Sequence, residues 1–200
     1  MKKILHIISS PRKGQSFSIK LGNAIVDKIQ AKYPGSMLTE VNLIDKQFPH
    51  LEEVHLQSFF TPAESRSPEL IEAVKHSDEA IQQIKDADII VIGAGMYNFS
   101  IHSSLKAWID HIVRKDITFY HDETGFHGLI KGKKVYIALS SGGVYTEGPM
   151  QAMDFRTPYL KALLSTLGMS DITQFAIEGT NIPGIQDTAV EKGLNSIVID

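Results

Sequence analysis

Short apolar runs alternate along this chain with longer segments in which apolar residues recur at every third or fourth position. The short runs predict strands at 3–8, 38–44, 88–93, 134–139 and 172–178. The longer segments predict helices at 17–32, 67–86, 103–114, 155–167 and 187–198. The run Ile89-Ile90-Val91-Ile92 is apolar without interruption, which is typical of a strand covered on both faces.

Residues that favour helix ends lie at the borders of several predicted helices. Ser67-Pro68 supplies an N-cap and a proline at the first helical position. Gly168 follows the 155–167 helix, where a glycine commonly ends a helix. We expect Ser103 to cap the 103–114 helix, which then presents Trp108 on an apolar face.

The alternation predicts an α/β fold in which a five-stranded parallel sheet carries helices on both faces. Five strands with five following helices match the flavodoxin-like doubly wound arrangement, whose order 2-1-3-4-5 makes strands 1, 3 and 4 neighbours. We expect residues 1–200 to form a single domain with insertions near 45–66 and 115–132. Both insertions exceed the usual connection length and contain aromatic residues. They pad the surface or build a dimer contact, or they wall an active site, and both can hold if the site lies at a subunit interface.

Composition excludes several classes of function. The formal net charge of -3 indicates no bias toward nucleic acid, and the absence of cysteine excludes a disulfide framework and a thiolate nucleophile. No apolar run approaches the roughly 20 residues of a membrane helix, and the apolar stretch after Met1 is too short for a signal peptide. No histidine spacing indicates a metal site. We therefore expect a cytoplasmic protein without membrane or nucleic-acid partners.

The loop after the first strand, Ser9 to Ser18, leads into a helix whose free N–H groups favour an anion. The hydroxyls of Ser10, Ser16 and Ser18 are candidates for a phosphate site, although a polar turn with a serine cap is the plain alternative. The loop has neither G-x-G-x-x-G nor G-x-x-x-x-G-K-[ST], which argues against a dinucleotide fingerprint and a P-loop. A mononucleotide with a terminal phosphate fits better.

The loop after the third strand contains Met96-Tyr97-Asn98-Phe99, which is unusually bulky for a strand-to-helix connection. Two aromatic rings, a thioether and an amide suit a flat, partly apolar ligand with hydrogen-bonding edges, such as the isoalloxazine ring of a flavin. Backbone amides here could bind the ring near its N5. The alternative is a loop that packs on a partner subunit.

The loop after the fourth strand, Ser140-Ser141-Gly142-Gly143, lets the backbone approach a ligand closely. Its amides would meet the pyrimidine side of a flavin, where negative charge develops on reduction, and Tyr145 is a further candidate donor there. A glycine pair that merely ends a strand is the commoner case. Because the three loops share one sheet edge, their combination predicts FMN.

Several of these segments together resemble the FMN-dependent NADH:quinone oxidoreductases, also called azoreductases. The resemblance is carried by Ser9-Ser10-Pro11-Arg12, Ser16-Phe17-Ser18, Met96 to Phe99 with Ser104 to Trp108, Ser140 to Gly143, and Gly148-Pro149 with Pro158-Tyr159-Leu160. Gly95 and His102 depart from the family pattern, in which proline usually precedes the methionine. His102 is either a polar contact to an acceptor or a solvent-facing residue.

The resemblance implies that NADH passes a hydride to FMN and that a quinone or azo compound then takes two electrons in the same place. It also implies a homodimer with FMN sites at its interface, for which Met96, Phe99 and Tyr120 are suitable. No catalytic residue and no metal ligand is expected, because the flavin carries the chemistry. The expected cofactor-binding residues are Ser10, Ser16, Phe17, Ser18, Met96, Tyr97, Asn98, Phe99, Ser140, Ser141, Gly142 and Gly143.

Two other functions compete with this one. A flavodoxin-like electron carrier would use the same cofactor, but such carriers tend to be shorter and markedly acidic. An NAD(P)H:FMN reductase that releases reduced flavin would bind FMN weakly. A phosphoacceptor signalling domain is excluded, because the strand ends read Ser9-Ser10 and Gly93-Ala94-Gly95 where it would need acidic residues.

Overall fold

A five-stranded parallel sheet forms the centre of the molecule in the computed structural model, which describes residues 1–200. Its strand order is β2-β1-β3-β6-β7, and all neighbouring strands run parallel. The bounds are β1 Lys3–Ile8, β2 Met37–Asn42, β3 Ile89–Gly95, β6 Lys134–Ser140 and β7 Asp171–Ile177. The sequence prediction of the order 2-1-3-4-5 is confirmed, with β6 and β7 as its fourth and fifth strands.

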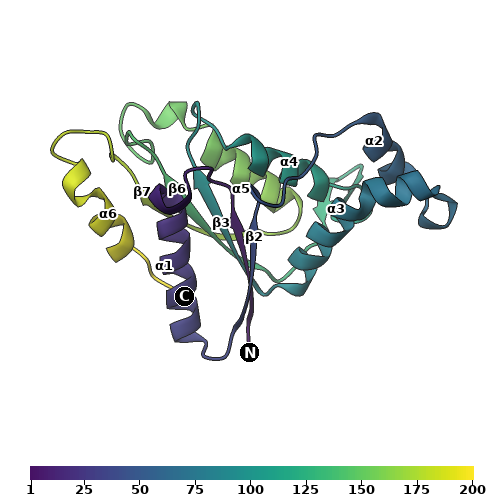
Figure 1. The fold of residues 1–200 in the computed structure, drawn as a ribbon, viewed down its shortest axis with the longest axis horizontal. Coiled ribbons are helices and arrows are strands. Elements are labelled where there is room, and N and C mark those ends of the chain that lie inside the picture. The colour runs from purple at the N-terminus through teal and green to yellow at the C-terminus, as the bar shows by residue number, and fades with distance from the viewer.

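Helices cover both faces of this sheet, as Figure 1 shows. The helices α1 (Phe17–Lys32) and α6 (Gln186–Asn195) lie on one face, and α3 (Pro68–Asp86), α4 (Ser103–Ile112) and α5 (Arg156–Thr166) lie on the other. Alternate residues of β3 belong to the two hydrophobic cores. Ile90 and Ile92 belong to the core beneath α3, α4 and α5, and Val91 belongs to the core beneath α1 and α6. This division follows from the two-residue period of a strand.

Local capping explains where most of these helices begin and end. Ser67 accepts a hydrogen bond from the N–H of Leu70 at 3.3 Å, and Pro68 begins α3, as predicted. Gly168 follows α5 with a φ of +100°, the left-handed conformation that a helix-ending glycine adopts. The prediction for α4 was wrong by one residue, because the N-cap is His102 and not Ser103.

Each long insertion contains secondary structure that the periodicity did not predict. The first holds α2 (Glu53–Phe60), which lies beyond α3 and α4 and buries His55 edge-on against His111 at 5.3 Å. The second forms an antiparallel hairpin of β4 (Phe119–Asp122) and β5 (Gly125–Gly128). A Cβ at Gly128 would lie 2.0 Å from the amide nitrogen of Gly168, so the hairpin base packs directly on the end of α5.

No helix of the molecule combines the length and the apolar character needed to cross a membrane. The amino ends of the parallel strands lie at one edge of the sheet and the carboxyl ends at the other. The loops that follow β1, β3, β6 and β7 therefore meet at a single edge.

Candidate functional site

Two adjoining cavities lie at the carboxyl edge of the sheet. The smaller, of about 180 Å³, is lined by Ser10, Arg12, Ser16, Phe17, Gly95, Met96, Tyr97, Ser140, Ser141, Gly142, Thr180 and Asn181. The larger, of about 480 Å³, is lined by Met96, Asn98, Phe99, Gly142, Gly143, Tyr145, Asn181 and Ile182. Met96, Gly142 and Asn181 line both. Every cofactor-binding residue expected from the sequence therefore lines one of the two cavities, except Ser18.

The serine loop ends in a capped helix that has free donors. Ser16 Oγ accepts the N–H of Ile19 at 3.4 Å and lies 3.1 Å from Ser18 Oγ. Because Phe17 and Ser18 are the first two residues of α1, their N–H groups have no acceptor inside the helix. Ser18 is almost completely buried, so its hydroxyl does not line the cavity and instead holds the Ser16 hydroxyl in position. The exposed cation Arg12 lines the same cavity.

Tyr97 joins the serine loop to the loop after β3, because its hydroxyl lies 3.2 Å from Ser10 Oγ. The backbone of Tyr97 exchanges two hydrogen bonds with Ser100, at 2.9 and 3.0 Å. The two residues between them, Asn98 and Phe99, both have positive φ, 48° and 66°. A tight turn of this kind normally holds asparagine or glycine, and phenylalanine in the left-handed region is strained. Strain of this kind clusters at functional sites.

This strained turn presents unused donors to the larger cavity. The N–H groups of Asn98 and Phe99 donate to no group of the protein. The turn is held in place by a hydrogen bond in which the carbonyl of Phe99 accepts the N–H of Phe155 at 3.0 Å. The ring of Phe99 meets Tyr145 edge-on at 6.2 Å. The turn therefore places two amides and an aromatic wall on one side of the cavity.

The loop after β6 forms the opposite side and is held by a carboxylate. Glu178, at the end of β7, accepts the N–H groups of Tyr145 at 3.0 Å and Thr146 at 3.2 Å, and the hydroxyl of Ser141 at 3.2 Å. The N–H groups of Gly142 and Gly143 donate to no group of the protein. Two more free amides therefore line the site.

Glycine at 142 lets the side chain of Asn181, from the next loop, approach closely. A Cβ at Gly142 would lie 2.6 Å from Nδ2 of Asn181. Sequence reasoning missed Glu178, Thr180 and Asn181. The signal was available, because this polar segment follows the fifth strand and must end at the same sheet edge.

Arg156 is a further residue that sequence reasoning missed. Its side chain is fully buried, and Nη1 donates to the carbonyls of Ala94 at 3.1 Å and Ser140 at 2.9 Å. Although burial opposes ionisation, hydrogen bonds from Thr157 and the charge of Arg156 lower the pKa of Asp154 beside it. Nothing in the sequence distinguishes this arginine from one on an exposed helix face.

His102 caps α4, a role that the sequence analysis did not assign to it. Its Nδ1 accepts the N–H of Ser104 at 3.2 Å, and its ring meets Tyr97 edge-on at 4.9 Å. Burial lowers the pKa of His102, which favours the neutral ring that this acceptor role needs. The ring also lines a third cavity of about 790 Å³, whose aromatic walls are Tyr97, Phe155 and Tyr159.

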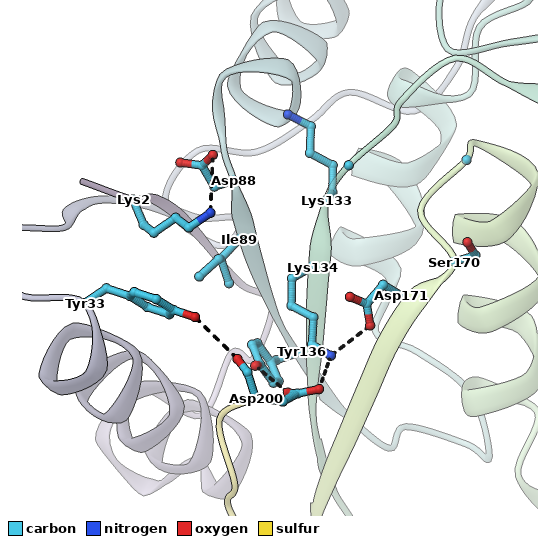
Figure 2. A pocket seen from close by; sticks show the side chains of 12 residues that line it. Lys2, Tyr33, Asp88, Ile89, Lys133, Lys134, Tyr136, Ser170, Asp171 and Asp200 are labelled. Carbon is cyan, nitrogen blue, oxygen red and sulfur yellow. Dashed lines mark hydrogen bonds and ion pairs between the residues drawn. The ribbon is translucent and has the colours of Figure 1, made fainter.

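A further cavity, of about 350 Å³, lies at the amino edge of the sheet, far from these loops (Figure 2). The charged side chains that line this cavity form hydrogen bonds and ion pairs with one another. Lys134 bonds to Asp171 at 2.8 Å and to Asp200 at 2.7 Å, and Tyr136 donates to Asp200 at 2.9 Å. Burial and the bond to Asp200 raise the pKa of Tyr136 to about 12. The carboxyl edge is different, because there the donors are free.

The residues at the carboxyl edge fit a phosphorylated flavin. The serine loop offers hydroxyls, helix N–H groups and the charge of Arg12 at the smaller cavity. The larger cavity offers unpaired amides from the loops after β3 and β6, together with the aromatic rings of Phe99 and Tyr145. Such a cavity, with an apolar wall and a few directed donors, is typical of a cofactor site.

Comparison with known proteins agrees with this geometry. A family model described as a flavodoxin-like fold matches residues 2–198. An FMN-dependent NADH:quinone oxidoreductase of Herminiimonas arsenicoxydans is 47% identical over 179 residues, which cover 90% of this chain and 88% of that protein.

Two solved azoreductase structures are similar to this chain over almost their whole length. An azoreductase from Bacillus anthracis strain Sterne superposes with a TM-score of 0.90 at 27% identity and covers 98% of this chain and 96% of its own. An FMN-dependent NADH-azoreductase from the Ames Ancestor strain, solved in complex with FMN, superposes with a TM-score of 0.85 at 27% identity and covers 98% and 97%.

Proposed function

The chain belongs to the FMN-dependent NADH:quinone oxidoreductases of the flavodoxin-like fold family, and from this premise we propose how its own residues serve that reaction. It is an enzyme that transfers two electrons from NADH, through bound FMN, to quinones and aromatic azo compounds. Its relatives carry the names of both activities. We assign residues 1–200 to one FMN-binding domain.

The serine loop holds the phosphate of FMN in this proposal. The hydroxyls of Ser10 and Ser16 and the N–H groups of Phe17 and Ser18 are the donors, and Ser18 Oγ keeps Ser16 in place. The positive end of the α1 dipole favours the same anion. Arg12 adds a flexible positive charge at the mouth of the cavity.

The loops after β3 and β6 hold the ring system. Met96, which lines both cavities, and Tyr97, which lines the smaller one, support it, and the amides of Asn98 and Phe99 bind its N5 side. The loop from Ser140 to Gly143 binds the pyrimidine side through the free amides of Gly142 and Gly143. When bound, FMN supplies hydride acceptance from NADH and two-electron donation to the acceptor.

The protein itself needs no acid, base or nucleophile for this exchange. Its residues position the ring and leave one face open to NADH and then to the acceptor. Free amides on the pyrimidine side favour the negative charge that reduction adds there. NADH and the quinone or azo compound therefore take turns in one place, and the reaction is of the ping-pong type.

We further propose a cytoplasmic homodimer with FMN sites at its interface. The support is a group of exposed aromatic side chains close to the site and on the β4–β5 hairpin: Phe99, Tyr120, Phe126 and Phe155. Together with Met96 beside the cavities, they suit a surface that a second copy covers. The use of NADH as reductant supports the cytoplasmic location.

A single observation carries the assignment of the site: unpaired donors from three loops meet around two adjoining cavities at one sheet edge. The test is to load purified protein with FMN, remove free flavin, titrate anaerobically with NADH while recording flavin absorbance, and then add a quinone. Bleaching at one NADH per FMN that the quinone reverses is the expected result.

Other outcomes identify the competing functions. Bound flavin that responds to neither NADH nor NADPH indicates an electron carrier with an external reductase. Flavin that is reduced and then lost from the protein on gel filtration indicates a reductase that releases its product. Protein that retains no flavin contradicts the assignment of the three loops.

A further inference from the structure

A buried arginine lies directly behind the wall of the two cavities. Arg156 is 0% exposed, and its Nη1 donates to the carbonyl oxygens of Ala94 and Ser140 at 3.1 and 2.9 Å. These carbonyls lie at the carboxyl end of the pairing between β3 and β6, where Gly95 pairs with Ser140. Both Gly95 and Ser140 line the smaller cavity, so the guanidinium is separated from it by one layer of backbone.

The charge of this arginine is paired with one buried carboxylate. The nearest carboxylate oxygen, Oδ2 of Asp154, lies 3.5 Å from Nη2. Asp154 is already engaged, because its Oδ1 accepts the N–H groups of Arg156 and Thr157 and its Oδ2 accepts the hydroxyl of Thr157 at 2.6 Å. Nε of Arg156 has no partner.

The next carboxylate, Glu178, is also occupied. Its oxygens accept the N–H groups of Tyr145 and Thr146. Burial lowers the pKa of Arg156, but a guanidinium stays protonated in proteins. A permanent positive charge therefore lies behind the cavities.

A buried cation of this kind is costly, because it has lost its hydration and gains in return two carbonyl partners and one carboxylate, Asp154 at 3.5 Å. An apolar side chain could fill the same space between α5 and the sheet without that cost. The cost has a use where negative charge appears during the reaction. Hydride transfer from NADH leaves NAD⁺ and adds two electrons and one proton to the flavin, so the bound group becomes more negative by one charge.

Resting on the FMN site proposed above, we propose that Arg156 is a positioning residue whose buried charge raises the reduction potential of the bound flavin. It acts through the backbone of Gly95 and Ser140, and through the electric field that reaches the cavities in a poorly screened interior. The same hydrogen bonds keep the loops after β3 and β6 at a constant separation.

The test compares Arg156→Met, which removes the charge, with Arg156→Lys, which keeps it. The midpoint potential of bound FMN is measured by anaerobic titration against a reference dye, and the affinity for oxidised FMN is measured separately. We expect Arg156→Met to weaken binding of reduced relative to oxidised FMN about tenfold, which lowers the two-electron potential by about 30 mV. Arg156→Lys should recover most of that shift.

A third variant covers the case in which Arg156→Met does not fold. Asp154→Asn keeps the guanidinium and removes its nearest negative charge, so it should raise the potential. A wild-type or lower potential in Asp154→Asn overturns the proposal. So does a potential in Arg156→Met equal to that of the wild type, or an equal shift in Arg156→Lys and Arg156→Met.

These failures differ from failure of the proposed function. If the wild-type protein retains no FMN, both the function and this inference are wrong. If it retains FMN and reacts with NADH, but its potential is insensitive to Arg156 and Asp154, only this inference is wrong.

Discussion

Replacing Ser16 with alanine separates the structural role of this residue from its proposed role in binding. Ser16 caps α1 through the N–H of Ile19 at 3.4 Å, and Ser67 caps α3 in the same way through Leu70 at 3.3 Å. Loss of either serine cap should cost about 1 kcal/mol of stability. Ser67→Ala is therefore a matched control, because Ser67 lines neither cavity at the carboxyl edge.

The two variants should differ in FMN affinity. Ser16 lines the smaller cavity, where its hydroxyl is assigned to the phosphate. A hydrogen bond to a charged group contributes about 1.5–3 kcal/mol. At 1.4 kcal/mol per factor of ten, Ser16→Ala should weaken FMN binding roughly 10- to 150-fold. Ser67→Ala should leave the affinity within about twofold of the wild type, because a surface change away from the site has little effect.

The assay combines urea unfolding of the apoprotein with FMN binding followed by quenching of flavin fluorescence. The expected result is a loss of stability in both variants and a loss of affinity in Ser16→Ala alone. If Ser16→Ala binds FMN as tightly as Ser67→Ala does, Ser16 does not hold the phosphate. If the two variants lose affinity equally, helix stability and not a direct contact explains the effect.

Three further predictions concern other parts of the site. Gly142→Ala places a Cβ 2.6 Å from Nδ2 of Asn181. Because the exposed Asn181 side chain can move aside, FMN binding should weaken by about 1 kcal/mol, the low end of an overpacking cost. Asn181→Ala in the same chain should restore that loss, and Gly14→Ala, where nothing lies within 4 Å, should bind normally in the same titration. Burial opposes ionisation of Asp154, but hydrogen bonds and a neighbouring guanidinium outweigh it and lower the pKa of this carboxyl. The contribution of Asp154 to stability is therefore present above its unfolded pKa of about 4, and it is lost as the pH falls through the lower pKa of the folded state. Asp154→Asn should flatten that acid limb in urea unfolding, and an unchanged limb would assign it to other carboxylates. Gly95→Pro tests whether Gly95 keeps the ring-binding loop flexible, because the substitution should change FMN affinity or the acceptor profile; if steady-state assays find neither change, that interpretation of Gly95 is wrong.

Much of the fold could be predicted because its determinants are local. The predicted bounds of α1 were correct at both ends, and those of β6 were correct at the first residue and one residue short at the last. These bounds could be predicted because the apolar period and the capping residues lie in or next to the elements themselves. The short helix α2 and the β4–β5 hairpin were missed. Their apolar residues are too few to establish a period, and they are stabilised by contacts with distant segments, such as His55 on His111 and Gly128 on Gly168.

The sequence by itself determined the parallel sheet, its strand order and the three loops that carry donors and aromatic rings, since alternation of strand and helix dictates which loops share an edge. The tertiary structure alone decided what supports those loops. It placed Arg156 behind two strand ends, Glu178 beneath the glycine loop and His102 as a cap. The reason is physical: burial and partnership of a charged side chain depend on residues far away in the chain, and no local pattern records them.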